Sequence, residues 1–481
     1  MLFNSYYYIF LFLPIMIIAY FAVNRINYTL GKLLLVLGSI FFYSYGRIEV
    51  SLYIAVSILV NYTLALLARK TAKARVIIVL SCALNVGFLF ALKYTNFAIA
   101  NINHIFDKQI PLQSLIVPIG ISFYTFQQIS YTISVAKKEI EMGCFLDYLT
   151  YILFFPKILM GPLVEPRDFI SQLNDETRKT INWTEMMWGI RSFSVGLIKK
   201  VLIADTFSRA VSWGFENMET VTSVDCFLIM VFYTFEIYFD FSGYSDMAIG
   251  SASMLNFDLP INFDAPYRSL NIREFWKRWH ITLTKFFTKY IYIPLGGSKK
   301  GSCRLLINTM IVFLISGIWH GANWTFIVWG LVHGIFVCFD NLLEKFRVKF
   351  FEPIRWILTL GIVNVLWLLF RAESVSQWVY MLKRMAFMDN TTVSEGIVNA
   401  FEVPETNLIL NIMHLNSFHE HIRGFMMMVF IIVSIIICLL QNKKYYKTGN
   451  NNLLMIIITA LLFSWGVLCL GTETTFVYMN F

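Results

Sequence analysis

The chain has 481 residues, of which 57% are hydrophobic and only 14% are charged, and its formal net charge is +9 at pH 7. A soluble domain carries about 25% charged residues, so this composition excludes a protein that faces only water and indicates a lipid bilayer as the main solvent. Excess basic charge in a membrane protein usually marks its cytoplasmic loops. Because bulk charge is weak evidence for a specific partner, we predict no nucleic acid among the partners.

Apolar stretches recur along the whole chain, and a spanning helix needs roughly 20 apolar residues. The first, residues 6–23, lacks a basic leader and a small-residue cleavage site, which predicts a retained helix rather than a signal peptide. The centres of the predicted spanning helices are Ile15, Leu37, Ile58, Leu84, Phe123, Val201, Phe232, Val312, Val328, Ile362, Ile432 and Ile458. With no internal repeat or linker, the sequence predicts an all-α polytopic membrane protein with a single domain over residues 1–481.

Basic loops set the predicted orientation, because Lys and Arg stay in the cytoplasm. The short basic loop at residues 69–75 is placed inside, which puts the N-terminus outside. Alternation then places the other basic regions inside as well: 137–138, 268–304, 345–349 and 443–447. Residues 148–163 are interrupted by Pro156, Gly161 and Pro162 and are predicted to be re-entrant, because such breaks at membrane depth are tolerated only inside protein or beside a cavity. The alternation of inside and outside loops works only if this segment does not cross the membrane.

Residues 372–421 are acidic on balance and are predicted to form an extracytoplasmic cap with an amphipathic helix at 377–388. The cap contains His414, His419 and His421, which could bind zinc, but structural zinc normally takes four ligands. The seven cysteines are scattered without a CxxC pair, which indicates small buried hydrophobes rather than disulfides or a zinc site. We therefore predict no metal site.

Three carboxylates interrupt the apolar stretch EIYFDFSGYSDMAIG, residues 236–250. Glu236 and Asp240 are four residues apart and share a helix face, and Asp246 follows. Carboxylates at membrane depth need partners, and the available cations are Arg191, Lys199, Lys200 and the cluster around Arg273. Buried ion pairs, a polar tunnel wall and proton-coupled transport all fit this composition.

Residues 268–297 interleave basic and aromatic side chains around His280. If the segment is one helix, Arg273, Trp276 or Lys277, and His280 lie near one face. Such a segment can anchor the chain to anionic headgroups. It can equally form a cationic mouth for an anionic, aromatic donor such as coenzyme A. The predicted donor-binding residues are Arg273, Trp276, Lys277, Arg278 and Trp279.

A second histidine, His320, lies between Gly317 and Gly321 in an apolar stretch. The glycines predict a helix that is broken or closely packed at this histidine. Histidine is the natural general base for a hydroxyl proton at neutral pH, although an interhelical hydrogen bond would also place it here. His333, thirteen residues later, is interpreted as helix packing or tunnel lining.

Together these stretches resemble the membrane-bound O-acyltransferase family, in particular its bacterial alginate and peptidoglycan O-acetylation branch. The resemblance rests on ordered strings within a core at residues 118–334: PIGISFYTFQ (118–127), FFPK (154–157) with Gly161-Pro162, YFDFSGYSD (238–246), FWKRWH (275–280), YIPLGG (292–297) and WHGANW (319–324). One departure is the insertion of residues 163–165 before Pro166-Arg167, where the family commonly has a basic residue sooner.

The resemblance implies a funnelled bundle of about 11–13 transmembrane or re-entrant helices around a central tunnel. It implies His320 as the catalytic residue and His280 as the second active-site histidine. The predicted tunnel-lining residues are Asp240, Ser242, Asp246, Asn323 and His333. It further implies a multi-pass protein of the bacterial cytoplasmic (inner) membrane.

The implied reaction is O-acetylation of an extracytoplasmic polysaccharide, such as an alginate-like exopolysaccharide or peptidoglycan. Acetyl-CoA, or another acyl thioester, would be a donor substrate, with no tightly bound cofactor. The implied partner is an extracytoplasmic acetyltransferase with a serine nucleophile. Direct transfer with His320 as base and relay through an acyl-histidine both remain open. The alternatives are D-alanyl transfer to teichoic acid, a proton-coupled transporter or flippase, and a scaffold that only anchors a secreted partner.

Overall fold

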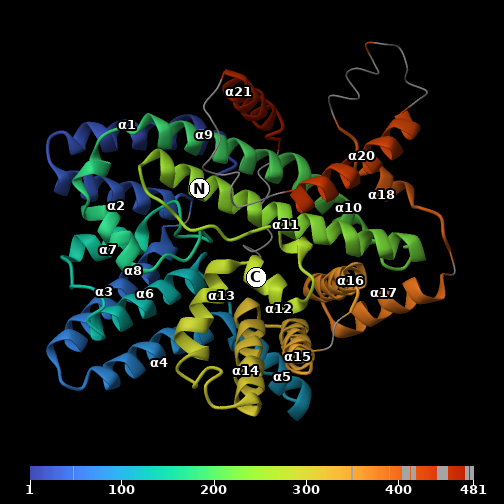
Figure 1. Ribbon diagram of the computed structural model, residues 1–481, viewed down its shortest axis with the longest axis horizontal. Coiled ribbons are helices and arrows are strands. Elements are labelled where there is room, and N and C mark those ends of the chain that lie inside the picture. Colours follow the sequence, from blue (N-terminus) through green and yellow to red (C-terminus); the bar gives the residue numbers. More distant parts are fainter. Residues whose placement is uncertain are drawn as a thin grey trace. The chain divides into compact units, whose positions relative to one another are not determined.

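The computed structural model describes residues 1–46, 48–347, 350–388, 390–403, 412, 419–440, 453–471 and 476, and these residues form helices joined by loops (Figure 1). They belong to two compact units. Unit 1 comprises Met1–Gly196, Tyr244–Ile261 and Asn450–Phe481, and unit 2 comprises Leu197–Gly243 and Asn262–Gly449. The long helix α11 (Ser223–Met254) contributes residues to both units. His414, one of the three histidines considered for zinc, lies outside the described residues, as do residues 389, 404–411 and 413–418 of the predicted cap at 372–421.

Unit 1 is built from apolar helices that pack in pairs. After a π-helical turn at Tyr8–Phe12, its helices are α1 (Leu13–Asn24), α2 (Tyr28–Ser44), α3 (Glu49–Lys70), α4 (Ala74–Lys93), α5 (Thr95–Phe106), α6 (Ile121–Ala136), α7 (Phe145–Leu153), α8 (Pro166–Asn174), most of α9 (Trp183–Ile198), and α21 (Leu453–Leu468). Helix α6 packs against both α3 and α4, and α2 packs against α1 and α7. Residues 121–135 of α6 are almost all buried, so protein rather than lipid surrounds this helix.

Buried amides hold α3, α4 and α6 together. Asn61 of α3 and Asn85 of α4 form a reciprocal pair, with the Asn85 Nδ2 donating to Asn61 Oδ1 at 2.6 Å and the Asn61 Nδ2 donating to Asn85 Oδ1 at 3.1 Å. The Asn61 Nδ2 also donates to Gln128 Oε1 of α6 at 2.9 Å, and Gln128 accepts a further bond from Ser57 at 2.8 Å. In an apolar environment such bonds are the main polar contribution to helix association.

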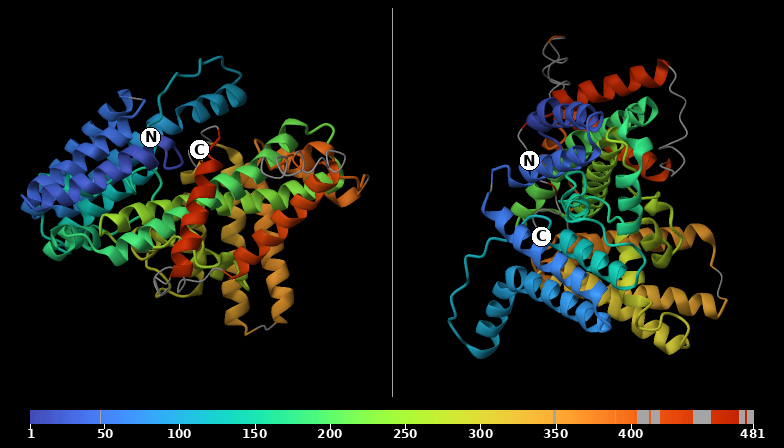
Figure 2. Two further views of the ribbon diagram at one scale, coloured as in Figure 1. Left: turned by 90° about the horizontal axis from the view of Figure 1, so that it is seen from above. Right: turned by 90° about the vertical axis from the view of Figure 1, so that its left-hand side faces the viewer.

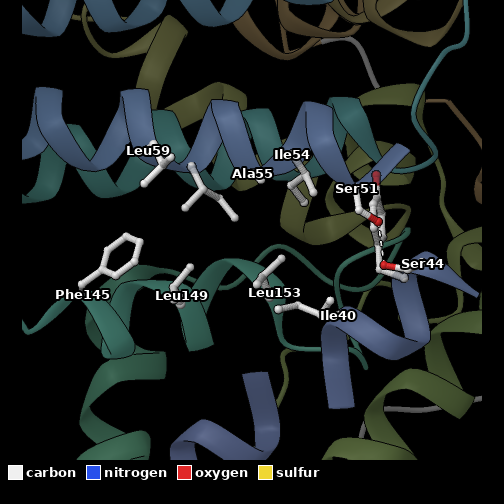
Figure 3. A pocket seen from close by; sticks show the side chains of 11 residues that line it. Ile40, Ser44, Ser51, Ile54, Ala55, Leu59, Phe145, Leu149 and Leu153 are labelled. Carbon is white, nitrogen blue, oxygen red and sulfur yellow. Dashed lines mark hydrogen bonds between the residues drawn. The ribbon is translucent and has the colours of Figure 1, made fainter. Parts of the chain in front are cut away.

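A groove of about 320 Å³ opens between α2, α3 and α7 of unit 1 (Figure 3). Figure 3 shows Leu59 and Ile54 of α3 facing Phe145 and Leu149 of α7 across it. A hydrogen bond of 2.6 Å between the Ser44 and Ser51 hydroxyls lies at one end. The lining offers hydrocarbon almost everywhere, so it suits lipid chains rather than polar chemistry.

The predicted interruption near Pro156 is confirmed, because α7 ends at Leu153 and the next helix, α8, begins at Pro166. The loop between them is buried and contains Lys157. The Lys157 ammonium donates to the Gln127 side chain and to the Tyr151 carbonyl, and it lies 4.2 Å from the centroid of the Tyr151 ring. These contacts supply the partners that a buried cation needs.

Unit 2 contains the segments that carry both candidate histidines. Its helices are α10 (Asp205–Glu216), the first part of α11, α12 (Ile272–Arg278), α13 (Ile281–Phe287), α14 (Ser302–His320), α15 (Trp324–Lys345), α16 (Glu352–Arg371), α17 (Val375–Phe387), α18 (Glu395–Asn399) and α20 (His419–Leu440), with short helical turns at Lys199–Ala204, Pro266–Arg268 and Thr288–Tyr292. Helix α17 confirms the helix predicted at 377–388.

Helices α14 and α15 pack side by side, and glycines allow their close approach. The left view of Figure 2 shows the next packed pair, α15 and α16, as two neighbouring gold to orange helices at the bottom of the picture. A Cβ atom at Gly317 would clash with the Phe326 carbonyl and would lie 3.1 Å from the Gly330 Cα. A Cβ atom at Gly330 would clash with the Phe313 carbonyl and lie 3.0 Å from the Gly317 Cα. Small residues at such crossings are typical of membrane helices.

The predicted all-α membrane fold is confirmed. Each predicted span centre lies in a helix, and six helices among the described residues are long and apolar enough to cross a bilayer: α3, α4, α14, α15, α16 and His421–Leu440 of α20. Tyr8–Asn24, Tyr28–Ser44 and α21 are shorter apolar helices. The chain is therefore a multi-pass membrane protein.

The close crossing predicts that Gly317→Ala lowers stability, because the added methyl group meets backbone atoms that cannot move aside. The expected loss is about 1–3 kcal/mol, seen as a lower midpoint of thermal unfolding in detergent. Gly361→Ala in α16 is the matched control, since no atom lies within 4 Å of a Cβ there. Equal midpoints for the two variants would contradict this account of the crossing.

Asn61→Ala is expected to destabilise unit 1, because it leaves the amide of Asn85 and the carbonyl of Gln128 short of partners. The expected cost is about 1–3 kcal/mol, measured by thermal unfolding in detergent. Thr63→Ala is the control, since the exposed Thr63 hydroxyl bonds only within its own helix, to the Leu59 carbonyl. A midpoint for Asn61→Ala that matches the control would show that the amide network is not stabilising.

Candidate active site

His280 occupies a sharp break between α12 and α13, so the segment is not one helix. Helix α12 ends at Arg278, and His280 has a left-handed backbone with φ 43°. The break is possible because a neighbouring strap bonds the freed backbone groups. The Asp264 N–H donates to the Arg278 carbonyl at 3.0 Å, and the Ile281 N–H donates to the Asn262 carbonyl at 3.0 Å. Arg273 and His280 therefore do not share one helix face.

His320 is the last residue of α14, and it lies in a box of aromatic rings. Gly321 follows in extended conformation, so the helix ends at the histidine as the flanking glycines predicted. The imidazole centroid lies 4.8 Å from Trp319, 5.0 Å from Trp329 and 5.1 Å from Phe370, and the residue is 4% exposed. Elements α14, α15 and α16 thus each contribute a wall.

His280 and His320 have Trp319 as a common neighbour. The His280 ring lies 6.4 Å from the Trp319 ring and 4.7 Å from the edge-on ring of Phe241, centroid to centroid. His280 is fully buried in unit 2, like His320. The structure therefore brings the two predicted histidines to the same aromatic cluster, which we define as Trp276, His280, Trp319, His320, Trp329, His333, Trp367 and Phe370.

His333 joins this cluster through a hydrogen bond. The Trp276 indole N–H donates to His333 Nδ1 at 3.3 Å, and the two rings meet edge to face at 5.0 Å. Because indole is only a donor, Nδ1 must be the unprotonated nitrogen, and the neutral ring carries its hydrogen on Nε2. Within the described part of the chain, that Nε2–H is buried with no hydrogen-bond partner.

The predicted donor-binding residues separate into two groups. Trp276 and Trp279 are buried, and Trp279 packs in the core 4.8 Å from the ring of Trp367. The basic residues lie elsewhere. Arg278 pairs with Glu274 at 2.9 Å, Arg273 pairs with Glu344 at 2.5 Å, and Lys277 is exposed. Because a helix has about 3.6 residues per turn, neighbouring side chains of α12 point to different sides of it.

Four of the five predicted tunnel-lining residues are buried and Asn323 is half-buried, but several have structural contacts. The Lys200 ammonium lies 2.7 Å from Asp240 and 2.9 Å from Asp205, which confirms Lys200 as a partner for Asp240. Asn323 caps α15 by accepting from the Thr325 N–H at 3.1 Å and donates to the Glu373 carbonyl at 2.9 Å. Ser242 is buried next to Phe241 in unit 2, and Asp246 is buried in unit 1.

Sequence reasoning missed the side chains that enclose the histidines: Trp319, Trp329, Trp367 and Phe370. A signal was present, since Trp329 and His333 are four residues apart on α15, and Trp367 and Phe370 are three apart on α16. Such pairs share a helix face. The spacing does not show which other helix packs against that face.

This arrangement can support acyl transfer chemistry. Imidazole is the side chain best suited to accept and return a proton near neutral pH, and desolvation favours its neutral, basic form. Aromatic walls exclude water from the reacting atoms, which suppresses hydrolysis of an activated acyl group. Among the described residues there is no group of three or more His, Cys, Asp or Glu side chains placed to hold a metal ion.

The Trp276–His333 contact predicts that His333→Ala is destabilising, because it opens a cavity and leaves the buried indole N–H without an acceptor. The expected cost is about 2–4 kcal/mol, measured by thermal unfolding in detergent. His333→Gln should recover part of this loss, since its amide oxygen can accept the bond. Unchanged stability of the Ala variant would mean that the bond contributes little.

Comparison with known proteins agrees with this chemistry. The family model described as MBOAT, membrane-bound O-acyltransferase family, matches residues 6–381. The chain is 35% identical over 427 residues to the peptidoglycan O-acetyltransferase of Helicobacter pylori, covering 82% of this chain and 81% of that protein. It is 35% identical over 405 residues to the probable alginate O-acetylase AlgI of Pseudomonas putida, covering 82% of each.

A weaker similarity extends to the teichoic acid D-alanyltransferase of Bacillus subtilis, with 28% identity over 266 residues that cover 53% of this chain and 67% of that protein. The family match spans the elements that form the aromatic cluster, from α12 to α16. The chain belongs to the membrane-bound O-acyltransferase family and is an O-acyltransferase.

Proposed function

We propose that this enzyme takes an acetyl group from cytoplasmic acetyl-CoA and delivers it for O-acetylation of an extracytoplasmic polysaccharide, in the bacterial inner membrane. The relatives named for peptidoglycan and alginate acetylation, each 35% identical, support an acetyl group and a polysaccharide acceptor. The observation that carries the proposal is the position of His320, at the end of α14 in a buried aromatic box that also holds His280 and His333.

In the proposed step, an acceptor hydroxyl oxygen attacks the thioester carbonyl carbon. A C–O bond forms, the C–S bond breaks, and CoA leaves as a thiolate. His320 takes the hydroxyl proton during attack and returns it to the thiolate sulfur, so protons balance. The thioester is already activated, so placement of the base within about 3 Å of the hydroxyl supplies most of the catalysis.

His280 is proposed to orient the donor or to polarise its carbonyl. A neutral imidazole can donate one N–H bond to the carbonyl oxygen, where negative charge develops during attack. The strap at Asn262 and Asp264 supports this role, because it fixes the backbone on both sides of His280. The immediate acceptor is proposed to be the serine of a separate extracytoplasmic acetyltransferase, which passes the acetyl group to the polymer.

The test uses purified protein in nanodiscs with acetyl-CoA labelled on the acetyl group, followed by free CoA release and label transfer. His320→Ala is expected to lower both by about 10²- to 10⁴-fold, the usual contribution of a positioned general base. His104→Ala is the control, because His104 is an exposed histidine in the last turn of α5. Turnover that is equal in the His320→Ala and control proteins would overturn the assignment.

D-alanyl transfer is the rival within the family. The similarity to the teichoic acid enzyme covers only 53% of this chain, against 82% for each acetylation relative, and this favours acetyl transfer. If wild-type protein gives no turnover with acetyl-CoA but does turn over an aminoacyl thioester on a carrier protein, the D-alanyl function replaces the acetyl one.

A further inference from the structure

A second pocket, of about 790 Å³, lies in unit 2 among α12, α15 and α16. Its volume is within the range of 300–1,000 Å³ that is usual for small-molecule sites. The described residues that line it include none of the histidines of the aromatic cluster. Its lining changes character along its length, with arginines and carboxylates at one end and Phe336, Phe339, Leu358 and Ile362 at the other. The pocket is therefore amphipathic.

The charged end lies at the depth where a bilayer changes from hydrocarbon to headgroups. Helices α15 and α16 are candidate spans of 22 and 20 residues; α15 ends at Lys345 and α16 begins at Glu352. Arg347 lies two residues beyond the end of α15, and Arg355 lies in the first turn of α16. Spans of this length reach across a hydrocarbon core of about 30 Å, so the end of α15 and the start of α16 lie at the interface.

The charges at this end do not cancel. Arg273 is already paired with Glu344 at 2.5 Å and donates to Asn341 at 2.9 Å, while the Asp340 carboxylate accepts from the Arg273 backbone N–H at 2.9 Å. No salt bridge within 4.0 Å is found for Arg347 or Arg355 in the described part of the chain, although Asp340 interacts electrostatically with Arg355 and offsets part of its charge. Three arginines and two carboxylates line the pocket, so their net charge is +1. This net positive charge favours an anion, and guanidinium is well matched to phosphate.

The apolar end faces the bilayer. Phe339 is 54% exposed and Leu358 is 58% exposed, on helices that are themselves candidate spans. From Arg355 to Ile362, α16 rises by about 10 Å into the hydrocarbon, at 1.5 Å per residue. A ligand that places an anionic group at the arginines and a hydrocarbon chain along Leu358 and Ile362 matches this order of side chains.

We propose that this pocket binds an anionic glycerophospholipid, with its phosphate between Arg347 and Arg355 and one acyl chain along Phe339, Leu358 and Ile362. The lipid would brace α12 against α15 and α16, because Leu270, Ile272 and Arg273 also line the pocket. It would thereby steady the segment that leads into His280. The proposal does not rest on the identity of the acyl donor or acceptor.

The test is native mass spectrometry of the full chain with equal amounts of phosphatidylglycerol and phosphatidylcholine that have the same acyl chains. Wild-type protein should retain phosphatidylglycerol in preference, and the double variant Arg347→Gln/Arg355→Gln should retain it roughly 10- to 30-fold less. Arg69→Gln/Lys70→Gln is the matched control, because it removes two positive charges at the end of another candidate span, α3. That control should retain the lipid as the wild type does.

The apolar end is tested separately. Leu358→Trp should lower retention by filling the chain site, whereas Ile357→Trp, its exposed neighbour outside the pocket lining, should not. Equal retention of both lipids by wild-type protein would overturn the proposal, as would full retention by a folded Arg347→Gln/Arg355→Gln protein. Displacement of the lipid by coenzyme A but not by inorganic phosphate would assign the pocket to a nucleotide instead. Displacement by inorganic phosphate alone would reduce it to a free-phosphate site.

Discussion

Backbone hydrogen bonding in a medium without water is the constraint on which this structure depends. A helix that stops inside the bilayer leaves amides and carbonyls that lipid cannot satisfy. The break at His280 is possible only because Asn262 and Asp264 supply the missing backbone partners. The end of α14 at His320 is followed at once by Asn323, whose side chain caps α15. Both candidate histidines therefore lie at helix ends, near residues that hydrogen-bond to backbone groups of those ends.

Hydropathy predicted the helices well, because burial in lipid requires long apolar stretches whatever their neighbours. Pro156 and the glycines around His320 likewise predicted real interruptions, since their effects are local. The condition that one helix runs from Arg273 to His280 is not met, and the reason is non-local. Residues such as Trp279 and His280 do not themselves stop a helix, and the strap that permits the break begins eighteen residues earlier, at Asn262.

In the candidate site too, the sequence predicted local features but not the contacts between distant segments. The ordered strings identified His280 and His320 and the family, and the structure brings both histidines to Trp319. The aromatic walls from Trp329 and Phe370 were missed because tertiary packing, rather than spacing, decides which rings meet. Similarly, composition grouped Trp276 with Arg273 as donor-binding, but α12 directs Trp276 towards His333 and Arg273 towards Glu344. Trp276, in the aromatic cluster, and Arg273, in an ion pair outside that cluster, are thus only one turn of α12 apart.

The crossing of α14 and α15 restricts how this protein can evolve. When two side chains clash, a smaller residue at one position can make room for a larger one at the other. Here a methyl group at Gly317 or at Gly330 meets main-chain atoms of the partner helix, including the carbonyls of Phe326 and Phe313. No substitution shrinks a main chain, so neither position has a compensating change. The two glycines are fixed independently of each other, and homologues that retain this crossing should lack correlated variation at the pair.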